Sequence, residues 1–366
     1  MVQLKNLIYD LTNLDGNCGN EDNVIKYILE KLKDKADEIE VDSIGNVVAV
    51  FKSTKKNAKK IMTFAHMDEV GMIVRKIDND GFIRVEKLGS CNPNILSGLR
   101  VEVITENSKI PGVVGVKSHH FLQPEDKGKI SSLKDIYIDI GAFSKEDVER
   151  CGVKIGAPIV YKSDFLELQN NLISNKAMDD RALVAVLINL GLNINKEKLN
   201  NDLYIVFSVQ EEFNTRGILP MFRKIKPDFI FGFDITPACD TPDLKSYSDI
   251  KVGSGVAITY MNHHSRGTLA GLTPNFRLLR FIEKIAEENK IKFQREIATG
   301  ILTETAYIIL ESENGVVGNI SVPTRYTHSN IEVLSLDDVL ASYNLIKNIV
   351  YKLEPSNNFS KKVLLD

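Results

Sequence analysis

The pattern of apolar and polar residues at the start of the chain is first that of a helix and then that of buried strands. An apolar residue at every fourth position from Val24 to Leu32 predicts an amphipathic helix over residues 21–33. Two continuous apolar runs of strand length follow, Val47–Phe51 and Ile61–Ala65. The opening of the chain is therefore predicted to be the first part of an α/β unit.

The pattern changes between residues 71 and 164, where short apolar runs are separated by turn signals. The Asn79-Asp80-Gly81 segment lies between two such runs and predicts a hairpin. No pattern in this stretch is typical of a long helix. We therefore predict that residues 71–164 form a separate β-rich domain, inserted after the strand that ends at His66.

Helical and strand patterns alternate again from residue 165 onward. This alternation predicts a mostly parallel sheet with helices on both faces, an α/β/α architecture, built from residues 1–70 and 165–354. Ser335 followed by Asp338 predicts a capping box at the start of the last helix. The polar residues 355–366 are expected to form a flexible tail.

Composition and charge exclude several classes of protein. Hydrophobic residues make up 43% and charged residues 26%, which is typical of a folded globular chain and not of a disordered one. The net charge of −3 predicts no binding to nucleic acid, and no apolar run reaches the roughly 18 residues of a membrane span. The four cysteines form no CxxC pair, and the N-terminus lacks the features of a signal peptide, so we expect a cytoplasmic protein with free thiols.

Acidic residues and histidines gather where the predicted strands end. Ligands of open α/β sheets bind outside the carboxyl ends of the strands, so these polar segments are expected to converge. A fifth acidic segment opens a predicted helix. The five segments are His66-Met67-Asp68-Glu69, Lys176-Ala177-Met178-Asp179-Asp180-Arg181, Gln210-Glu211-Glu212, Asp234, and Thr324-Arg325-Tyr326-Thr327-His328.

Two histidines among several carboxylates form a donor set that suits divalent metal ions. Two ions about 3.5–4 Å apart need a bridging carboxylate and would share a nucleophilic water. Asp68, two residues after His66, is expected to accept a hydrogen bond from the imidazole. Glu211 and Glu212 are adjacent and point in different directions, so one can bind metal while the other moves a proton.

Each segment also has a purely structural explanation. Paired glutamates are common on solvated helix faces, and Asp179 and Asp180 could simply favour a helix N-terminus. A lone His-x-Asp pair is weak support for a metal. Uncompensated carboxylates at buried strand ends are nevertheless costly, so five such segments at one edge favour a functional site.

The same segments, in the same order, resemble the successive signatures of metallopeptidase family 42. These are the TET-type, glutamyl or deblocking aminopeptidases, some of which were labelled cellulase M. The resemblance covers nearly the whole chain. The motifs that carry it are His66-Met67-Asp68-Glu69-Val70-Gly71, Lys176 to Arg181, Gln210-Glu211-Glu212, Phe233-Asp234-Ile235-Thr236, and Val322 to Ser329.

The resemblance implies a metal-dependent aminopeptidase with two divalent ions, zinc or cobalt, and short peptides as substrates. It implies that His66 and Asp234 bind one ion, that Glu212 and His328 bind the other, and that Asp179 bridges them. Asp68 would orient His66, and Glu211 would be the general base. It further implies that the inserted domain mediates dimerisation and that dimers assemble into tetrahedral dodecamers.

Two segments depart from the family pattern. Phe213-Asn214-Thr215-Arg216-Gly217 replaces the usual Val-Gly-Leu-Arg-Gly-like turn, and Asn214 is expected to supply its left-handed residue. Gly300-Ile301-Leu302-Thr303-Glu304 replaces a Gly-Gly-Thr-Asp-like loop, which leaves the preferred N-terminal residue of the substrate open.

Two other functions are alternatives to the aminopeptidase. A glycoside hydrolase could use two carboxylates such as Glu211 and Asp234, but it needs no histidine pair, and the chain has no Trp for a sugar platform. An inactive self-assembling scaffold would have no reason to keep every metal ligand. Both remain alternatives to the metallo-aminopeptidase.

Overall fold

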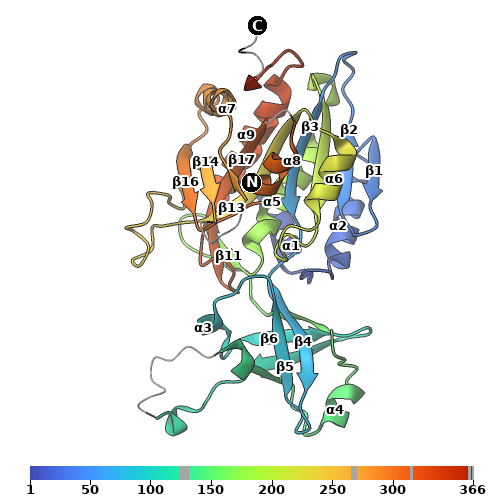
Figure 1. The fold of residues 1–366 in the computed structure, drawn as a ribbon, viewed down its shortest axis with the longest axis vertical. Helices are drawn as coiled ribbons and strands as arrows, with labels where there is room; N and C mark the ends of the chain where they lie inside the picture. The colour runs from blue at the N-terminus through green and yellow to red at the C-terminus, as the bar shows by residue number, and fades with distance from the viewer. Residues whose placement is uncertain (124–131, 265–269, 314–315, 362–363, 365–366) are drawn as a thin grey trace.

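The protein consists of a large α/β unit and a smaller β-barrel, which lies below the large unit in Figure 1. The computed structural model describes residues 1–123, 132–264, 270–313, 316–361 and 364. Both strands that begin and end the barrel connect to the large unit, so the barrel is an insertion in the chain of that unit.

The large unit is built on a sheet of twelve strands within the described residues. These strands are β1 (Glu38–Val41), β2 (Val47–Phe51), β3 (Lys60–His66), β10 (Leu166–Glu167), β11 (Leu172–Asn175), β12 (Asp202–Ser208), β13 (Phe229–Pro237), β14 (Val256–His263), β15 (Gly271–Leu272), β16 (Phe293–Thr299), β17 (Val317–Arg325) and β18 (Glu332–Ser335). Their order is β1-β2-β12-β3-β13-β17-β18-β11-β10, and β14 joins β17 to β15 and β16.

The four central strands, β12, β3, β13 and β17, run parallel to one another. Their carboxyl ends therefore lie at one edge of the sheet, where the polar segments follow. The neighbouring strands β2 and β18 are antiparallel to this centre, and the only other parallel pair among the described strands is β14 with β16. The predicted α/β/α fold class is confirmed, but the sheet is mixed instead of mostly parallel, since most of its strand pairs outside the centre are antiparallel. The parallel pairing is concentrated where the site lies.

Helices cover both faces of this sheet. One face carries α1 (Val2–Thr12), α2 (Asp22–Leu32), α5 (Met178–Asn193), α7 (Phe276–Glu288) and α9 (Leu336–Lys352), and the other carries α6 (Ile218–Ile225) and α8 (Thr305–Glu311). Ile61 and Ala65 of β3 pack into the first core, whereas Met62 and Phe64 pack into the second. Side chains of a strand alternate between the faces, so the largely apolar β3 contributes to both cores.

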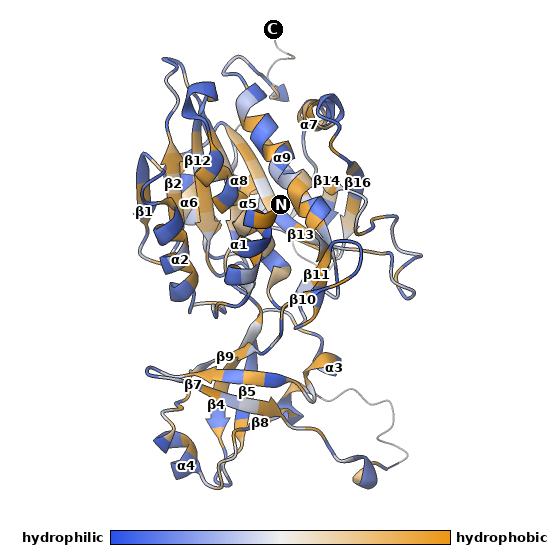
Figure 2. Ribbon diagram, turned by 180° about the vertical axis from the view of Figure 1, so that it is seen from behind, coloured by the Kyte–Doolittle hydropathy of each residue, from blue (hydrophilic) through white to orange (hydrophobic). Residues whose placement is uncertain are grey.

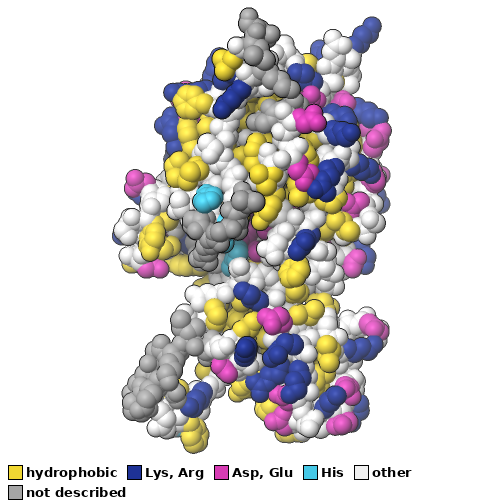
Figure 3. Space-filling model, viewed as in Figure 1, with side chains coloured by type: hydrophobic (Ala, Val, Ile, Leu, Met, Phe, Trp, Pro, Cys, Tyr) yellow, Lys and Arg dark blue, Asp and Glu magenta, His cyan; other side chains and the backbone are white. Residues whose placement is uncertain are grey.

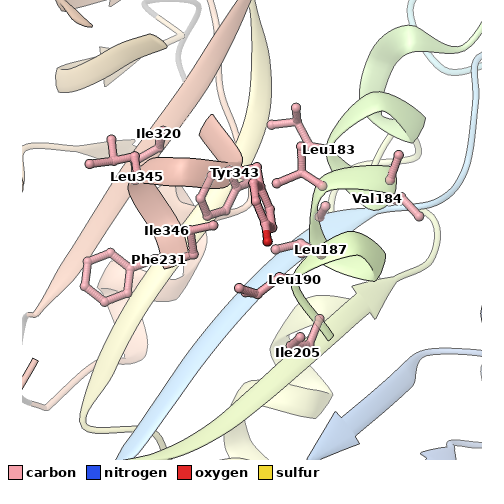
Figure 4. Close-up of a cluster of buried hydrophobic side chains, with 14 of the residues drawn as sticks. Leu183, Val184, Leu187, Leu190, Ile205, Phe231, Ile320, Tyr343, Leu345 and Ile346 are labelled. Atoms are coloured by element: carbon pink, nitrogen blue, oxygen red, sulfur yellow. The ribbon is translucent and has the colours of Figure 1, made fainter. Parts of the chain in front are cut away.

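Helix α5 is the centre of the larger core. Figure 4 shows Leu183 and Leu187 of α5 facing Tyr343 and Ile346 of α9, which packs beside α5 on the same face of the sheet. Nearly all of α5 is buried, which explains its apolar sequence on every side. In Figure 2 the central strands are likewise mainly hydrophobic, whereas the outer helices α1 and α2 show hydrophilic faces to solvent.

The smaller unit is a closed six-stranded barrel with its own hydrophobic core. It comprises β4 (Gly71–Ile77), β5 (Ile83–Leu88), β6 (Arg100–Ile104), β7 (Lys109–Val114), β8 (Tyr137–Asp139) and β9 (Pro158–Tyr161), with the short helices α3 (Pro93–Leu96) and α4 (Lys145–Arg150). The predicted hairpin is confirmed, because Asp78 donates to Phe82 across the turn and Gly81 has a φ of 88°.

Helix α1 was not predicted, although Leu4, Leu7, Ile8 and Leu11 have helical spacing and all are buried. The predicted capping box is wrong in its second half. Ser335 does cap α9 by accepting from the Asp337 N–H, but the Asp338 carboxylate accepts from the N–H groups of Gly253 and Gly255 instead.

The expected flexible tail is only partly unstructured in its described residues. Phe359 is buried and packs against Phe229 and Phe281, and its carbonyl accepts a hydrogen bond from Asn275. Phe359 lies within a polar segment, so the sequence pattern did not predict this buried contact. This contact ties the tail to the start of α7.

Two simpler expectations concern the membrane and the cysteines. Within the described residues, no helix combines the length and hydrophobicity that crossing a bilayer requires. All four cysteines are free thiols, as predicted.

Candidate metal centre

All the predicted site residues except Asp68 line one cavity of about 620 Å³ at the carboxyl edge of the central strands. His66 ends β3, Asp234 lies in β13, and His328 follows β17. Glu211 and Glu212 follow β12, and Asp179 lies at the start of α5. Figure 3 shows histidine side chains at this face of the large unit, just above the barrel.

Asp179 lies at the centre of the group, and its two oxygens face different histidines. Its Oδ1 is 3.0 Å from His66 Nε2, and its Oδ2 is 3.3 Å from His328 Nε2. The backbone at Asp179 has φ −76° and ψ 105°, which is not helical, so the residue is not simply an acid at a helix N-terminus. The chain turns here so that one carboxylate reaches both sides of the cavity.

Potential metal-binding atoms form two groups that share this carboxylate. In each group the donor atoms lie within 4.8 Å of one another. The first group is His66, Asp179 and Asp234, and the second is Asp179, Glu212 and His328. These five side chains are the same five that are expected from the sequence to bind metal.

The cavity concentrates negative charge without a compensating Lys or Arg among the described residues that line it. Burial raises the pKa of both Glu212 and Asp234 well above the usual range, and the charge of Asp179 adds to the effect. Burial also acts on Asp179, but its hydrogen bonds to His328 and His66 hold the pKa of that carboxyl below its ordinary value. Carboxylates that cannot easily ionise without a counterion fit a site for cations.

The two adjacent glutamates occupy different positions. Glu212 Oε1 lies 3.4 Å from His328 Nε2 and belongs to the second donor group. Glu211 lines the cavity but belongs to neither group. Burial raises the pKa of Glu211 to about 7, so its carboxyl can both take and release a proton near neutral pH.

Asp68 differs in detail from its prediction, because β3 ends at His66 and Asp68 is not part of the strand. The nearest acceptor to His66 Nδ1 is the backbone carbonyl of Asp68, at 3.2 Å, and the carboxylate Oδ1 lies at 3.5 Å. The carboxylate accepts hydrogen bonds from the N–H groups of Glu211, at 2.9 Å, and Glu212, at 3.1 Å. Asp68 therefore links the end of β3 to the loop that carries both glutamates.

Buried charges under the site hold its segments together. Lys176 donates to both oxygens of Glu69, and Arg181 donates to the carbonyls of Leu11, Leu14 and Gly16. Arg181 also donates to the carbonyl of Met67, which lies between His66 and Asp68 in the chain. Lys176 and Arg181, which lie near Asp179 in the sequence, thus have structural partners. The buried carboxylate of Asp180 has no hydrogen-bond partner among the described residues.

Two groups at the site were missed in the sequence. Glu332 accepts from the Asp179 N–H at 3.1 Å and from the His328 N–H at 2.6 Å, so one buried carboxylate holds the backbones of two site residues. Its position four residues after His328 was the available signal. The second group is the backbone carbonyl of Ser90, 2.6 Å from His328 Nδ1. No sequence pattern marks a backbone acceptor.

Both unusual segments border the cavity. Asn214 has a φ of 64°, so the predicted left-handed residue is confirmed, and Thr215 beside it has a φ of 53°. Gly300, Ile301 and Leu302 line the cavity. The loop that departs from the family pattern therefore borders the cavity.

Comparison with known proteins agrees with this geometry. The family model for the M42 glutamyl aminopeptidases matches residues 45–345. The chain belongs to the M42 family. It is 41% identical over 339 residues to the putative aminopeptidase SgcX of Escherichia coli K12, an alignment that covers 93% of this chain and 91% of the relative.

Solved structures of M42-like aminopeptidases share the whole fold. The aminopeptidase APDkam598 from the archaeon Desulfurococcus kamchatkensis superposes with a TM-score of 0.90 at 34% identity, covering 97% of this chain and 96% of that one. The TET1 peptidase of Pyrococcus horikoshii, which can assemble into a tetrahedron or a large octahedral shell, gives a TM-score of 0.85 at 28% identity, covering 96% of this chain and 100% of that one.

The M42 assignment makes this protein an aminopeptidase, a hydrolase that acts on peptides. It does not favour the glycoside hydrolase alternative.

Proposed function

We propose that this M42 protein is a dinuclear metallo-aminopeptidase that removes N-terminal residues from short peptides. The observation that carries the proposal is the position of Asp179, whose two oxygens face His66 and His328 on opposite sides. A carboxylate placed in this way is suited to bridge two cations. His66 and Asp234 would hold one, and Glu212 and His328 the other.

The donor set fits zinc or cobalt. Each cation would have one imidazole nitrogen and carboxylate oxygens, a mixture that suits these borderline metals better than Mg²⁺ or Ca²⁺. When bound, the cations would polarise the scissile carbonyl and make a water molecule acidic enough to act as nucleophile near neutral pH. They would also compensate the buried charge of the acidic cavity.

Glu211 would serve as the general base and then as the general acid. Its carboxylate would take a proton from the attacking water and deliver it to the leaving amine, so that water and peptide give one amino acid and a shortened peptide. The absence of Glu211 from both donor groups supports this role, since its oxygens would remain free. Asp68 would keep Glu211 in place through its hydrogen bond to the Glu211 N–H.

We further propose that the chain forms a homo-oligomer through its barrel. Large apolar side chains are exposed on this unit, including Val116, Phe121, Phe143 and Ile155, of which Phe143 is 91% exposed. Burying such side chains in an interface would favour association, because apolar surface would be removed from water. The assemblies of the Pyrococcus horikoshii TET1 peptidase support the same conclusion. Dimers and a tetrahedral dodecamer are the expected forms, measurable by light scattering after gel filtration.

The experiment that tests the function is hydrolysis of a panel of aminoacyl-p-nitroanilides and short peptides by the purified protein. We expect release of single N-terminal residues, loss of activity on chelation, and recovery on addition of Co²⁺ or Zn²⁺. N-terminally acetylated copies of the same peptides are the matched control and should not be cleaved. Full activity after removal of all metal would overturn the proposal.

A further inference from the structure

We infer that the barrel supplies part of the metal centre, because the Ser90 carbonyl fixes the orientation of the His328 ring. This inference rests on the proposed role of His328 as a metal ligand. Ser90 lies between β5 and α3, both barrel elements, and 238 residues separate it from His328 in the chain. Ser90 is therefore a positioning residue that acts through its backbone.

The contact determines which ring nitrogen is available. A backbone carbonyl can only accept, so the hydrogen in the 2.6 Å contact must lie on His328 Nδ1. In the neutral ring, Nε2 then has a free lone pair. Nε2 is also the nitrogen that faces Asp179 Oδ2 and Glu212 Oε1, at 3.3 and 3.4 Å. The carbonyl thus selects the tautomer that a metal ligand requires and points it at the other donors.

The segment that carries Ser90 is anchored in the barrel. Gly89 before it has a φ of 85°, and a Cβ at that position would lie 2.8 Å from Val70 Cγ1 and 3.2 Å from Glu212 Cβ. After it, the Asn92 side chain caps α3 by accepting from the Asn94 N–H, and Leu96 at the end of α3 is fully buried in the barrel core. A shift of the barrel would therefore move the acceptor of His328.

The other histidine has no such dependence. The acceptor nearest to His66 Nδ1 is the carbonyl of Asp68, two residues away in the same segment. Only the metal position formed by Glu212 and His328 should therefore respond to the barrel. This selectivity separates a positioning role of Ser90 from a general structural one.

An ester bond between residues 90 and 91 provides the direct test. Incorporating lactic acid at position 91 converts the Ser90–Cys91 amide into an ester, whose carbonyl is a weaker acceptor. Cys91→Ala is the matched control, since it has the same side chain with the normal amide. The Cys91 N–H makes no hydrogen bond among those found for the described residues, so its loss costs little.

The readout is titration of the metal-free proteins with Co²⁺, followed by visible absorption and calorimetry. His328→Ala identifies which of the two binding events belongs to the His328 position. We expect the ester to weaken that event about tenfold, the lower end of the range for outer ligand contacts, and to leave the other event unchanged. Equal affinities in the ester protein and in Cys91→Ala would overturn the inference.

A pair of glycine variants tests a broader point, whether the packing of the segment that carries Ser90 against Glu212 matters for this metal position. Gly89→Ala places a methyl group against Glu212 and displaces the Ser90 segment, whereas Gly98→Ala has a similar φ, 87°, with nothing within 4 Å of the new Cβ. Both variants carry similar backbone strain, so only the first should weaken Co²⁺ binding at the His328 position. Equal binding by both variants would contradict the role of the segment.

These results also distinguish the inference from the proposed function. If the natural protein takes up fewer than two Co²⁺ ions, the dinuclear proposal fails. If it takes up two, and His328→Ala loses one while the ester protein binds both normally, only the role of Ser90 fails.

Discussion

The two histidines of the site lie in regions of opposite character. His66 is 2% exposed, ends a central strand, and has its hydrogen-bond acceptor within its own segment. The His328 side chain is 33% exposed, follows a strand in a left-handed conformation with a φ of 60°, and depends on a carbonyl from the barrel. One half of the centre is formed within the large unit, by β3, β13 and the start of α5, whereas the other half also has a contact with the barrel.

Two metal positions with equivalent ligands can therefore differ in the residues that hold those ligands in place. Each proposed metal position has one histidine and shares Asp179, yet only one has all its supports within the large unit. Glu332 partly compensates, because it holds the backbones of Asp179 and His328 together. Variants that affect both halves, one half, or neither half can measure this asymmetry.

The largest effect is expected for a variant that keeps both metal positions intact and removes only the proton transfer. Glu211→Gln should lower kcat by about 10³-fold, within the usual range for a lost general base, because an amide cannot take a proton from water. Elemental analysis should still find two metal ions per chain. Near-normal turnover in a variant that holds two metals would contradict the role of Glu211.

The next largest effect is expected for variants of the two histidines, which compare the two metal positions directly. His66→Ala and His328→Ala should each lower the metal content from two ions to one, but only the first should strongly destabilise the metal-free protein. Removing the buried His66 ring leaves a cavity and should cost about 3 kcal/mol of unfolding free energy, against less than about 1 kcal/mol for the partly exposed His328. Urea denaturation at one protein concentration measures both. Equal losses would show that the two halves are equally supported.

A smaller effect concerns the pH dependence of activity. Burial raises the pKa of Glu211 to about 7, and the base must be ionised to act. Below that pKa, kcat/KM should fall about tenfold per pH unit, and bound cations would move the inflection to lower pH. A profile of kcat/KM between pH 5 and 9 measures it. An inflection well above pH 7 would indicate a different ionising group.

The smallest effect lies outside both halves, at Glu304. This buried carboxyl accepts from Ser208, and burial raises its pKa to about 8. Because the pKa of Glu304 is higher in the folded protein than in the unfolded chain, the folded state binds the proton more tightly. The free energy of unfolding therefore decreases as the pH rises from the unfolded pKa towards the folded pKa. Glu304→Gln should thus stabilise the metal-free protein by about 1 kcal/mol more for each pH unit from 5.5 to 7.5.

Thermal unfolding of this variant and of the natural protein across that pH range provides the measurement. Glu354→Gln, at an exposed position, is the control and should show no trend. A stability difference that does not change with pH would mean that Glu304 titrates normally in the folded protein.

The sequence by itself determined the elements and the identity of the converging residues. Apolar runs such as Ile61–Ala65 predict buried strands because both faces of a central parallel strand are covered, and polar residues directly after them must lie at the carboxyl edge. The β-rich texture of residues 71–164 likewise predicted a unit distinct from the sheet. These are local properties of spacing and composition, which the chain carries before it folds.

Only the tertiary structure decided how the site is held. Asp68 uses its carboxylate on the Glu211 loop, Asp338 accepts from a distant glycine loop instead of its own helix, and Ser90 reaches His328 through a backbone carbonyl. Every residue has such a carbonyl, so no pattern of side chains can reveal which one becomes a partner. That choice depends on how the barrel packs against the sheet, which is a property of the folded chain.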